Sequence, residues 1–254
     1  MTRKELKIVD KLDYEAFLSV VKRRRNCRKF KPDPIPDDHV KKILEAARWA
    51  MSGANGQPWE FIVIKDQKMK DQIAELAAQS RQRVFDIERT RVEELRMPAY
   101  RQRPTQPPSL QTAPVVIAVV GDRRTLQASV LYSNFVFGEG GPGACYFKNM
   151  GNATQLLCLA AAALGLGAQW SSVTSSWEDS LKRLLNVPEE LSIPTLVPIG
   201  YPDYKKPAPP FRRKLSDIVH SEKYDSSRYR TGEDIHNFLL ELRRRTGEAY
   251  AHGI

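Results

Sequence analysis

The chain has 254 residues, 41% of them hydrophobic, and a formal net charge of +10. This length and composition predict one sizeable globular domain with a hydrophobic core. The three cysteines, Cys27, Cys145 and Cys158, are widely spaced, and the four histidines form no HxxxH or HExxH pair. Neither a disulfide framework nor a metal site is therefore expected.

The N-terminal segment and the longest apolar run bear on the cellular location of the protein. The N-terminal segment MTRKELKIVDKLDYEAF lacks the apolar core of a signal peptide, and the run Leu156–Ala168 is too short to span a bilayer. We therefore expect a cytoplasmic protein without a membrane partner. The basic charge suits anionic ligands. Aromatic residues do not interleave with the basic runs and no nucleic-acid-reading motif is present, so no nucleic-acid partner is expected.

The first half of the chain alternates helical and extended patterns. A first helix has its apolar residues on one face: Tyr14, Phe17, Leu18 and Val21. The three prolines of Pro32–Pro36 predict an extended linker. A second helix runs from Asp37 to about Ala50, with acidic residues in its first turn. A loop of small and polar residues then leads into a strand at Phe61–Ile64.

The second half begins with a charged segment, Asp66 to about Arg96, which predicts a long exposed helix. The apolar runs at Val115–Gly121, Ala168–Val173 and Thr195–Gly200 predict three more strands. Further helices are predicted at Asn149–Leu164, at Trp177–Leu185 and from Thr231 to about Ala249. Strands interleaved with helices indicate an α+β or α/β layout.

The sequence contains no obvious group of catalytic residues. No nucleophile and base stand at a recognisable spacing, which favours a binding protein or an enzyme whose cofactor carries the reaction. The loop within Ala50–Ile64 could bring backbone donors to a ligand, or it could be an ordinary helix-to-strand connection. The basic segment Arg24–Arg28 fits a phosphate monoester, and the cluster Arg212–Lys214 could close on the same dianion.

Four blocks of this sequence, in order, resemble the FMN-dependent nitroreductase family. They are RRNCRKF from Arg24, SGANGQPWEF from Ser52, NATQLLCLAAAALGLGAQWSS from Asn152, and GYP followed by FRRKL. The SGAN loop and the WSS strand are more similar to the iodotyrosine-deiodinase-like branch than to the branch of bacterial nitroreductases with a Glu-Gly pair there.

This resemblance implies an α+β nitroreductase-like fold, with a mixed central sheet flanked by helices. It implies an entwined homodimer with two FMN sites, each built from both subunits. Residues 1–254 would form a single nitroreductase-like domain with a variable lid at about 80–112 and a C-terminal extension at about 205–254.

The family's FMN-binding residues can be carried over position by position. The segment for the phosphate and ribityl chain matches Arg24, Arg25, Asn26 and Arg28, with Asn26 where serine is common. The loop laid by the partner against the isoalloxazine matches Met51, Ser52, Gly53 and Asn55, with Met51 in place of a frequent proline, and a polar position near the flavin matches Gln57. The strand facing flavin N5 and O4 matches Trp170, Ser171 and Ser172. The C-terminal phosphate contact matches Arg213, with Arg212 as second choice.

The resemblance also implies a reaction. NAD(P)H would reduce FMN, and a nitroaromatic, a quinone or another activated aromatic acceptor would then take the electrons in ping-pong order. A hydrogen bond from Ser172 or a backbone N–H to N5 would favour the reduced flavin, so Ser172 is the candidate catalytic residue. The alternative is a flavin protein independent of nicotinamide: a flavin-consuming enzyme, or a flavin carrier or regulator. The arginines of the lid segment suggest an anionic substrate, or simply a solvated helix.

Overall fold

The computed structural model describes residues 13–97, 109–127, 142–204 and 210–251. The contacts between residues divide the chain into two units. The first comprises Met1–Ala78 and Pro107–Asp203, and the second comprises Gln79–Gln106 and Tyr204–Ile254. All of the central sheet lies in the first unit.

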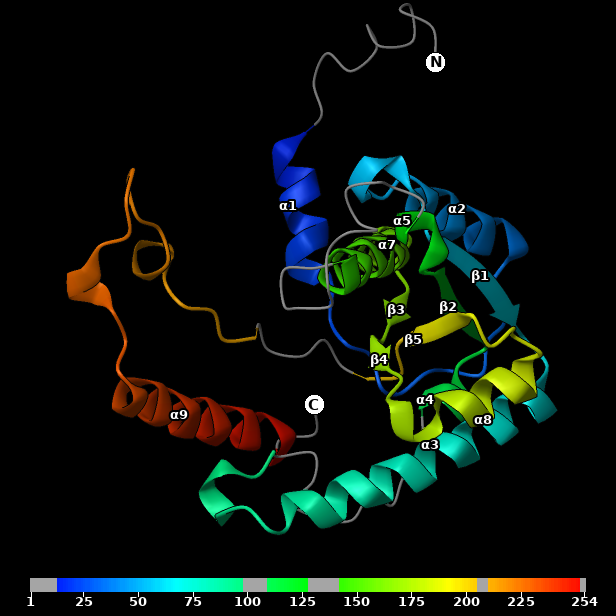
Figure 1. Cartoon of the computed structure of the whole chain (residues 1–254). Helices are drawn as coiled ribbons and strands as arrows, with labels where there is room; N and C mark the ends of the chain where they lie inside the picture. The colour runs from blue at the N-terminus through cyan, green and yellow to red at the C-terminus, as the bar shows by residue number, and fades with distance from the viewer. Residues whose placement is uncertain (1–12, 98–108, 128–141, 205–209, 252–254) are drawn as a thin grey trace, which may run out of the picture. The chain divides into compact units, whose positions relative to one another are not determined.

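The sheet has five strands, whose bounds are β1 Trp59–Ile64, β2 Val115–Asp122, β3 Gly167–Ala168, β4 Ser171–Ser172 and β5 Leu191–Gly200. Their order is β1-β2-β5-β3, and β4 also pairs with β5 (Figure 1). Every pairing between these named strands is antiparallel. The expectation of a mixed sheet is therefore wrong for these strands. Among the described residues, parallel pairing is limited to an isolated bridge between Asn26 and Ala168.

The helices of the first unit are α1 Tyr14–Arg23, α2 Asp37–Arg48, α4 Ser109–Thr112, α5 Arg124–Gln127, α7 Pro142–Ala163 and α8 Ser175–Leu185, together with the first part of α3 Gln67–Glu88. Along β2, alternate side chains point to opposite faces of the sheet. The face with Ile117 packs in one cluster with residues of α2 and α7. Figure 1 shows α8 on the opposite side of the sheet, and Trp177 and Leu181 of α8 are buried there.

Two strand predictions differ from the structure in an informative way. The single strand expected at Ala168–Val173 is split into β3 and β4, because the Trp170 N–H donates to the Asn26 side chain instead of joining the ladder. Strand β5 begins earlier than expected and contains Pro194 and Pro198. Their carbonyls accept hydrogen bonds from the Val173 and Gln169 N–H groups, so each proline takes part in pairing through its carbonyl oxygen.

Helix α1 forms as expected, but its apolar face is not covered. The Asp13 side chain caps the helix by accepting from the N–H groups of Glu15 and Ala16. None of the residues of α1 is buried, and Tyr14 and Phe17 are 64% and 58% exposed.

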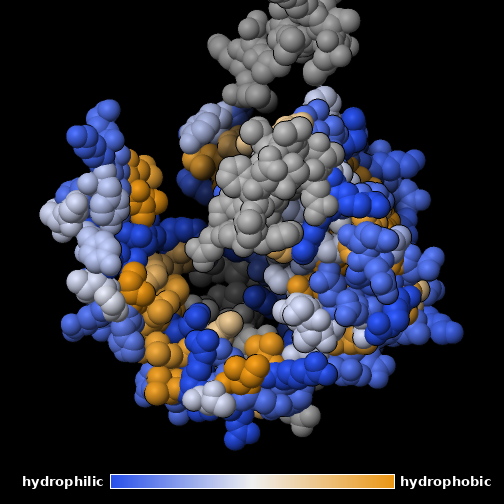
Figure 2. Space-filling view, in the orientation of Figure 1, coloured by the Kyte–Doolittle hydropathy of each residue, from blue (hydrophilic) through white to orange (hydrophobic). Residues whose placement is uncertain are grey.

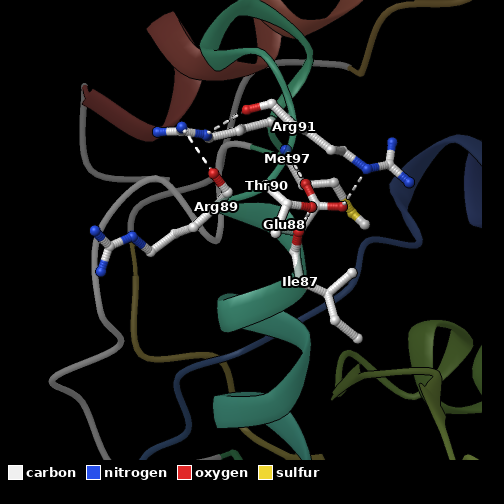
Figure 3. Close-up of polar contacts among 7 residues, drawn as sticks. Ile87, Glu88, Arg89, Thr90, Arg91 and Met97 are labelled. Carbon is white, nitrogen blue, oxygen red and sulfur yellow. Dashed lines mark hydrogen bonds and ion pairs between the residues drawn. The ribbon is translucent and has the colours of Figure 1, made fainter.

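The second unit contains the end of α3, which stops at Glu88 instead of continuing to about Arg96. The chain turns back there through η3 Glu93–Leu95. Figure 3 shows the reason: the buried Glu88 carboxylate accepts from the Met97 N–H at 2.8 Å and pairs with Arg91 Nε at 3.1 Å. The Arg96 guanidinium also donates to the carbonyls of Arg89 and Arg91. These bonds satisfy backbone groups that a continuing helix would otherwise use.

The C-terminal part of the second unit comprises η5 Leu215–Asp217, η6 Ser226–Arg228 and α9 Gly232–Ala251. Phe211 packs against Phe238 of α9, with the ring centroids 6.2 Å apart. Many apolar side chains of this segment are exposed, and Figure 2 shows hydrophobic patches along it, at the left of the view.

Candidate functional site

The basic segment Arg24–Arg28 lies beside the strand that carries Trp170. The Cys27 N–H donates to the Ala168 carbonyl at 2.9 Å, and Asn26 Oδ1 accepts from the Trp170 N–H at 3.3 Å. This close approach depends on Gly167, because a Cβ there would lie 2.7 Å from Cys27 Cβ. The structure thus brings together two of the segments predicted to hold FMN.

The arginines of this segment have different surroundings. Arg25 Nη1 donates to the Arg24 carbonyl at 2.8 Å and also to the Lys22 carbonyl, so its guanidinium closes the C-terminal end of α1. Arg24 is half-buried and Arg28 is exposed. Burial raises the pKa of the Cys158 thiol to about 11, with a small opposing effect from the Arg24 charge.

The loop Met51–Gln57 is held by α7 of its own chain. Asn149 Oδ1 accepts from the Gly53 N–H at 3.2 Å, and Asn152 Nδ2 donates to the Met51 carbonyl at 3.0 Å. Within the loop, the Ser52 hydroxyl accepts from the Gln57 N–H at 3.0 Å. Both asparagine bonds go to main-chain atoms, so they fix the path of the backbone whatever the loop side chains are.

This loop also contains an unusual backbone conformation. Ala54, Asn55 and Gln57 have φ values of 51°, 54° and 44°, in the left-handed region that residues other than glycine rarely adopt. Such conformations cost roughly 1–2 kcal/mol each for a residue with a Cβ, and they persist where the surroundings enforce them. Strained loops of this kind occur preferentially at ligand sites.

A pocket of about 540 Å³ opens beside the loop, lined by residues that include Trp49, Met51, Asn55 and Gln57. Trp49 is 65% exposed, and its Nε1 donates to Glu45 at 2.9 Å. The predicted loop residues Met51, Asn55 and Gln57 therefore have their side chains accessible to a ligand or a second chain.

A second pocket, of about 420 Å³, is open at the predicted catalytic residue. Its lining residues are Arg123, Phe147, Met150, Gly151, Trp170, Ser172, Val173, Ser175, Glu178, Ser192, Pro194 and Thr195. Ser172 is exposed and Ser171 is half-buried, consistent with the alternation of side chains along β4. Ser172 and Trp170 thus face a cavity large enough for a small aromatic molecule.

Buried polar groups lie beside this second pocket. The Tyr146 hydroxyl hydrogen-bonds the Ser192 hydroxyl, and burial raises the pKa of the Tyr146 phenol, so the phenol stays protonated. The Arg123 guanidinium lies over the rings of Tyr146 and Phe147, 5.2 and 5.4 Å from their centroids. The Glu178 carboxylate accepts from the Ile193 N–H at 2.8 Å, which ties α8 to β5.

The remaining predicted residues, Arg212 and Arg213, belong to the second unit. Both are exposed, and each donates to a nearby carbonyl: Arg212 to Phe211 at 2.8 Å and Arg213 to Asp217 at 2.7 Å. Their role as phosphate contacts stays a prediction.

Several residues of the site were missed by the sequence reasoning. Asn149 and Asn152 were read as part of an apolar helix, although two amides at i and i+3 on one helix face are a usable signal for a polar contact. Arg123 follows directly after the buried strand β2, a position where a side chain often reaches a site. In the sequence, Tyr146 is one of several aromatic residues around a glycine-rich segment, 138–143, and these residues fit either a pocket lining or a local cluster. Residues 138–141 of that segment lie outside the described residues.

Clusters of metal ligands and membrane-spanning helices are both absent from the described part of the chain. No group of three or more His, Cys, Asp or Glu residues that could hold a metal ion occurs in the described ranges. In those same ranges, no helix combines the length and the apolar character needed to cross a bilayer.

The chain is similar to several known proteins. It is 30% identical over 194 residues to an iodotyrosine deiodinase of Thermotoga neapolitana, which covers 75% of this chain and 91% of that protein. It is 27% identical over 220 residues to a Methanothermobacter thermautotrophicus protein named as a candidate NADH dehydrogenase/NAD(P)H nitroreductase, covering 85% and 90%. It also resembles the structure of an oxidised iodotyrosine deiodinase bound to FMN and 3-iodo-L-tyrosine, with a TM-score of 0.63, 26% identity, and coverage of 82% and 100%.

These relatives agree with the predicted resemblance to the iodotyrosine-deiodinase-like branch. Residues 21–201, most of the chain, match the sequence model of the nitroreductase family. That range includes the basic segment, the Met51–Gln57 loop and the pocket at Ser172. The chain therefore belongs to the nitroreductase family, a family of flavin oxidoreductases for which FMN is the typical cofactor.

Proposed function

We propose that this protein is an FMN-dependent oxidoreductase that passes electrons from NAD(P)H to a small aromatic acceptor in ping-pong order. The observation that carries the proposal is the meeting of the basic segment with Trp170, through the Asn26–Trp170 hydrogen bond, at the edge of the pocket that Ser172 lines. The names of the similar proteins support it, because they include a deiodinase and a candidate NAD(P)H nitroreductase.

The donor set of this region fits FMN. Arg24 and Arg28 carry guanidinium forks that match a phosphate dianion, and they flank Asn26, whose side chain already contacts the strand. The exposed Ser172 hydroxyl, or a backbone N–H of β4, would donate to flavin N5. When bound, FMN supplies the two-electron chemistry, and the protein supplies its orientation and electrostatics.

The proposed assembly is a homodimer in which the Met51–Gln57 loop of one chain lies against the flavin of the other. Two features support it. The loop is rigidly held by α7 while its side chains stay accessible, and the apolar face of α1 is uncovered. A concentration series in sedimentation velocity, with absorbance followed at a flavin wavelength, tests whether FMN travels with the dimer. FMN bound equally well by a monomer would contradict the shared site.

The function is tested by cofactor content and by reduction. Purified protein should be yellow and should release FMN on denaturation, and anaerobic NADPH or NADH should bleach the flavin band. A colourless protein that FMN cannot reconstitute would refute the proposal.

The same reduction experiment distinguishes the proposed oxidoreductase from the alternative, a flavin protein that does not use a nicotinamide. If dithionite bleaches the band but neither nicotinamide does, the protein is a flavin-consuming enzyme, a carrier or a regulator instead. Oxygen-dependent loss of the isoalloxazine chromophore would then identify the flavin-consuming enzyme.

A further inference from the structure

The pocket at Ser172 combines flat apolar walls with an accessible cation, the guanidinium of Arg123. Its walls include the rings of Phe147 and Trp170, and Arg123 lies at its exposed side. Membership of the nitroreductase family does not specify the electron acceptor. The positive charge in this pocket favours acceptors that carry a negative charge.

Arg123 is held in place by two aromatic side chains, Tyr146 and Phe147. Its guanidinium lies over the Tyr146 and Phe147 rings, and these two rings form an edge-to-face pair with centroids 5.3 Å apart. Tyr146 is fixed in turn by its bond to Ser192 and by burial to 1% exposure. Arg123 also lies within hydrogen-bonding range of the Tyr146 hydroxyl. A guanidinium has five N–H donors, so further N–H groups remain to bind a carboxylate.

The nearby carboxylates have other partners. Both oxygens of Asp122 accept from Arg124, at 2.9 Å from Nε and 2.8 Å from an Nη. Glu178 also lines the pocket, but one of its oxygens accepts the Ile193 N–H of β5. Among the ion pairs of the described residues, none joins Arg123 to either carboxylate. The positive charge of Arg123 is therefore not cancelled by an ion pair with either neighbouring carboxylate.

We infer that the pocket at Ser172 is a subsite for aromatic acceptors that carry a carboxylate, with Arg123 binding the carboxylate and Trp170 and Phe147 contacting the ring. The inference rests on the proposed function, since it names the substrate class of that site. Arg123 is a specificity residue in this account, and it takes no part in electron transfer.

The experiment compares 4-nitrobenzoate with 4-nitrobenzamide, which have the same shape but differ in charge. Their affinities for the oxidised protein are measured by calorimetry without a reductant, so no turnover occurs. Wild-type protein should bind the acid more tightly than the amide. Arg123→Gln should weaken binding of the acid by roughly 10- to 100-fold, as expected for a charge-assisted hydrogen bond, and change binding of the amide little.

Lys148, on α7 next to Phe147, provides a matched control. Lys148→Gln removes the same charge close to the pocket, from an exposed side chain that does not line it and that does not bind Asp122. It should keep the preference for the acid, and Arg123→Lys should keep part of it, because lysine retains the charge but not the fork. Equal thermal midpoints and flavin contents of the variants show that the fold is intact.

Three results would overturn the inference: no preference in the wild-type protein, a preference that survives Arg123→Gln, or an equal loss in Lys148→Gln. A slower reduction by NADPH in Arg123→Gln, with unchanged discrimination between acid and amide, would also overturn it and would assign Arg123 to the nicotinamide instead. Failure of the proposed function looks different: NAD(P)H then fails to reduce the flavin, while the binding preference can still be measured.

Discussion

Gly121 is a position where one added methyl group should be costly. A Cβ on this residue would lie 1.8 Å from the Tyr146 hydroxyl oxygen and 2.9 Å from Met150 Cε. Both neighbours are almost fully buried, at 1% and 2% exposure, so neither can move away into solvent. The substitution Gly121→Ala therefore forces the Tyr146 ring out of its place.

The magnitude follows from two contributions. Overpacking a dense core costs about 1–3 kcal/mol. Moving the ring also breaks the Tyr146–Ser192 hydrogen bond, which contributes about 1 kcal/mol. We therefore expect Gly121→Ala to lower the free energy of unfolding by about 2–4 kcal/mol.

Urea denaturation followed by tryptophan fluorescence measures this change, provided that the slope m is unaltered. A double-mutant cycle tests the cause. Tyr146→Phe removes the oxygen at 1.8 Å but leaves Cζ at 2.7 Å, so Gly121→Ala should cost less in that background, but still measurably. The steric explanation is refuted if the cost is below about 0.5 kcal/mol, or if it is the same in both backgrounds.

Three further predictions concern the loop, the turn after α3 and the core cysteine. Asn149→Ala should weaken FMN retention about tenfold, because the half-buried Gly53 N–H loses its acceptor, whereas Asn149→Asp keeps the acceptor. Fluorescence titration with FMN measures the retention, and equal loss in both variants would contradict this account. Glu88→Ala should raise amide exchange at Met97 at least tenfold, because the buried carboxylate is its acceptor, and unchanged exchange would show that other contacts hold the turn. The Cys158 pKa of about 11 lies above its ordinary value of 9.0, so only the unfolded state loses this proton between pH 9 and 11 and stability falls there as pH rises. Urea midpoints should fall less over that range in Cys158→Ala, and parallel falls would refute the assignment.

Much of the fold follows from local patterns. The continuous apolar run of β2 and the helices α2 and α8 were predicted because burial on one or both faces leaves a recognisable pattern in the sequence. Helix α1 was predicted from the helical spacing of its apolar residues, although none of them is buried. The ends of α3 and β5 were misplaced for a different reason. Glu88 and Met97 meet only after the chain has turned, and the prolines of β5 look like loop residues until their carbonyl partners are known.

The residues of the candidate site likewise include some that were predictable from the sequence and some that were not. The basic segment, the loop and the Trp170–Ser172 strand were recognisable because each is a short contiguous block. The positions of Arg123, Tyr146 and Asn149 depend on contacts between elements far apart in the chain, such as the ring of Tyr146 over Gly121 and the Asn149 side chain on Gly53. Such pairings leave no periodic trace in a single sequence.

The tethering of the Met51–Gln57 loop bears on how this protein can diverge. Because Asn149 and Asn152 bind main-chain atoms of the loop, its course does not depend on a stiff residue at position 51, where Met51 stands in place of a frequent proline. The outward-facing side chains can then be exchanged while the backbone course persists. A library randomised at Met51 should consequently yield mostly folded proteins with altered ligand preferences, whereas randomising the two helix asparagines should yield few.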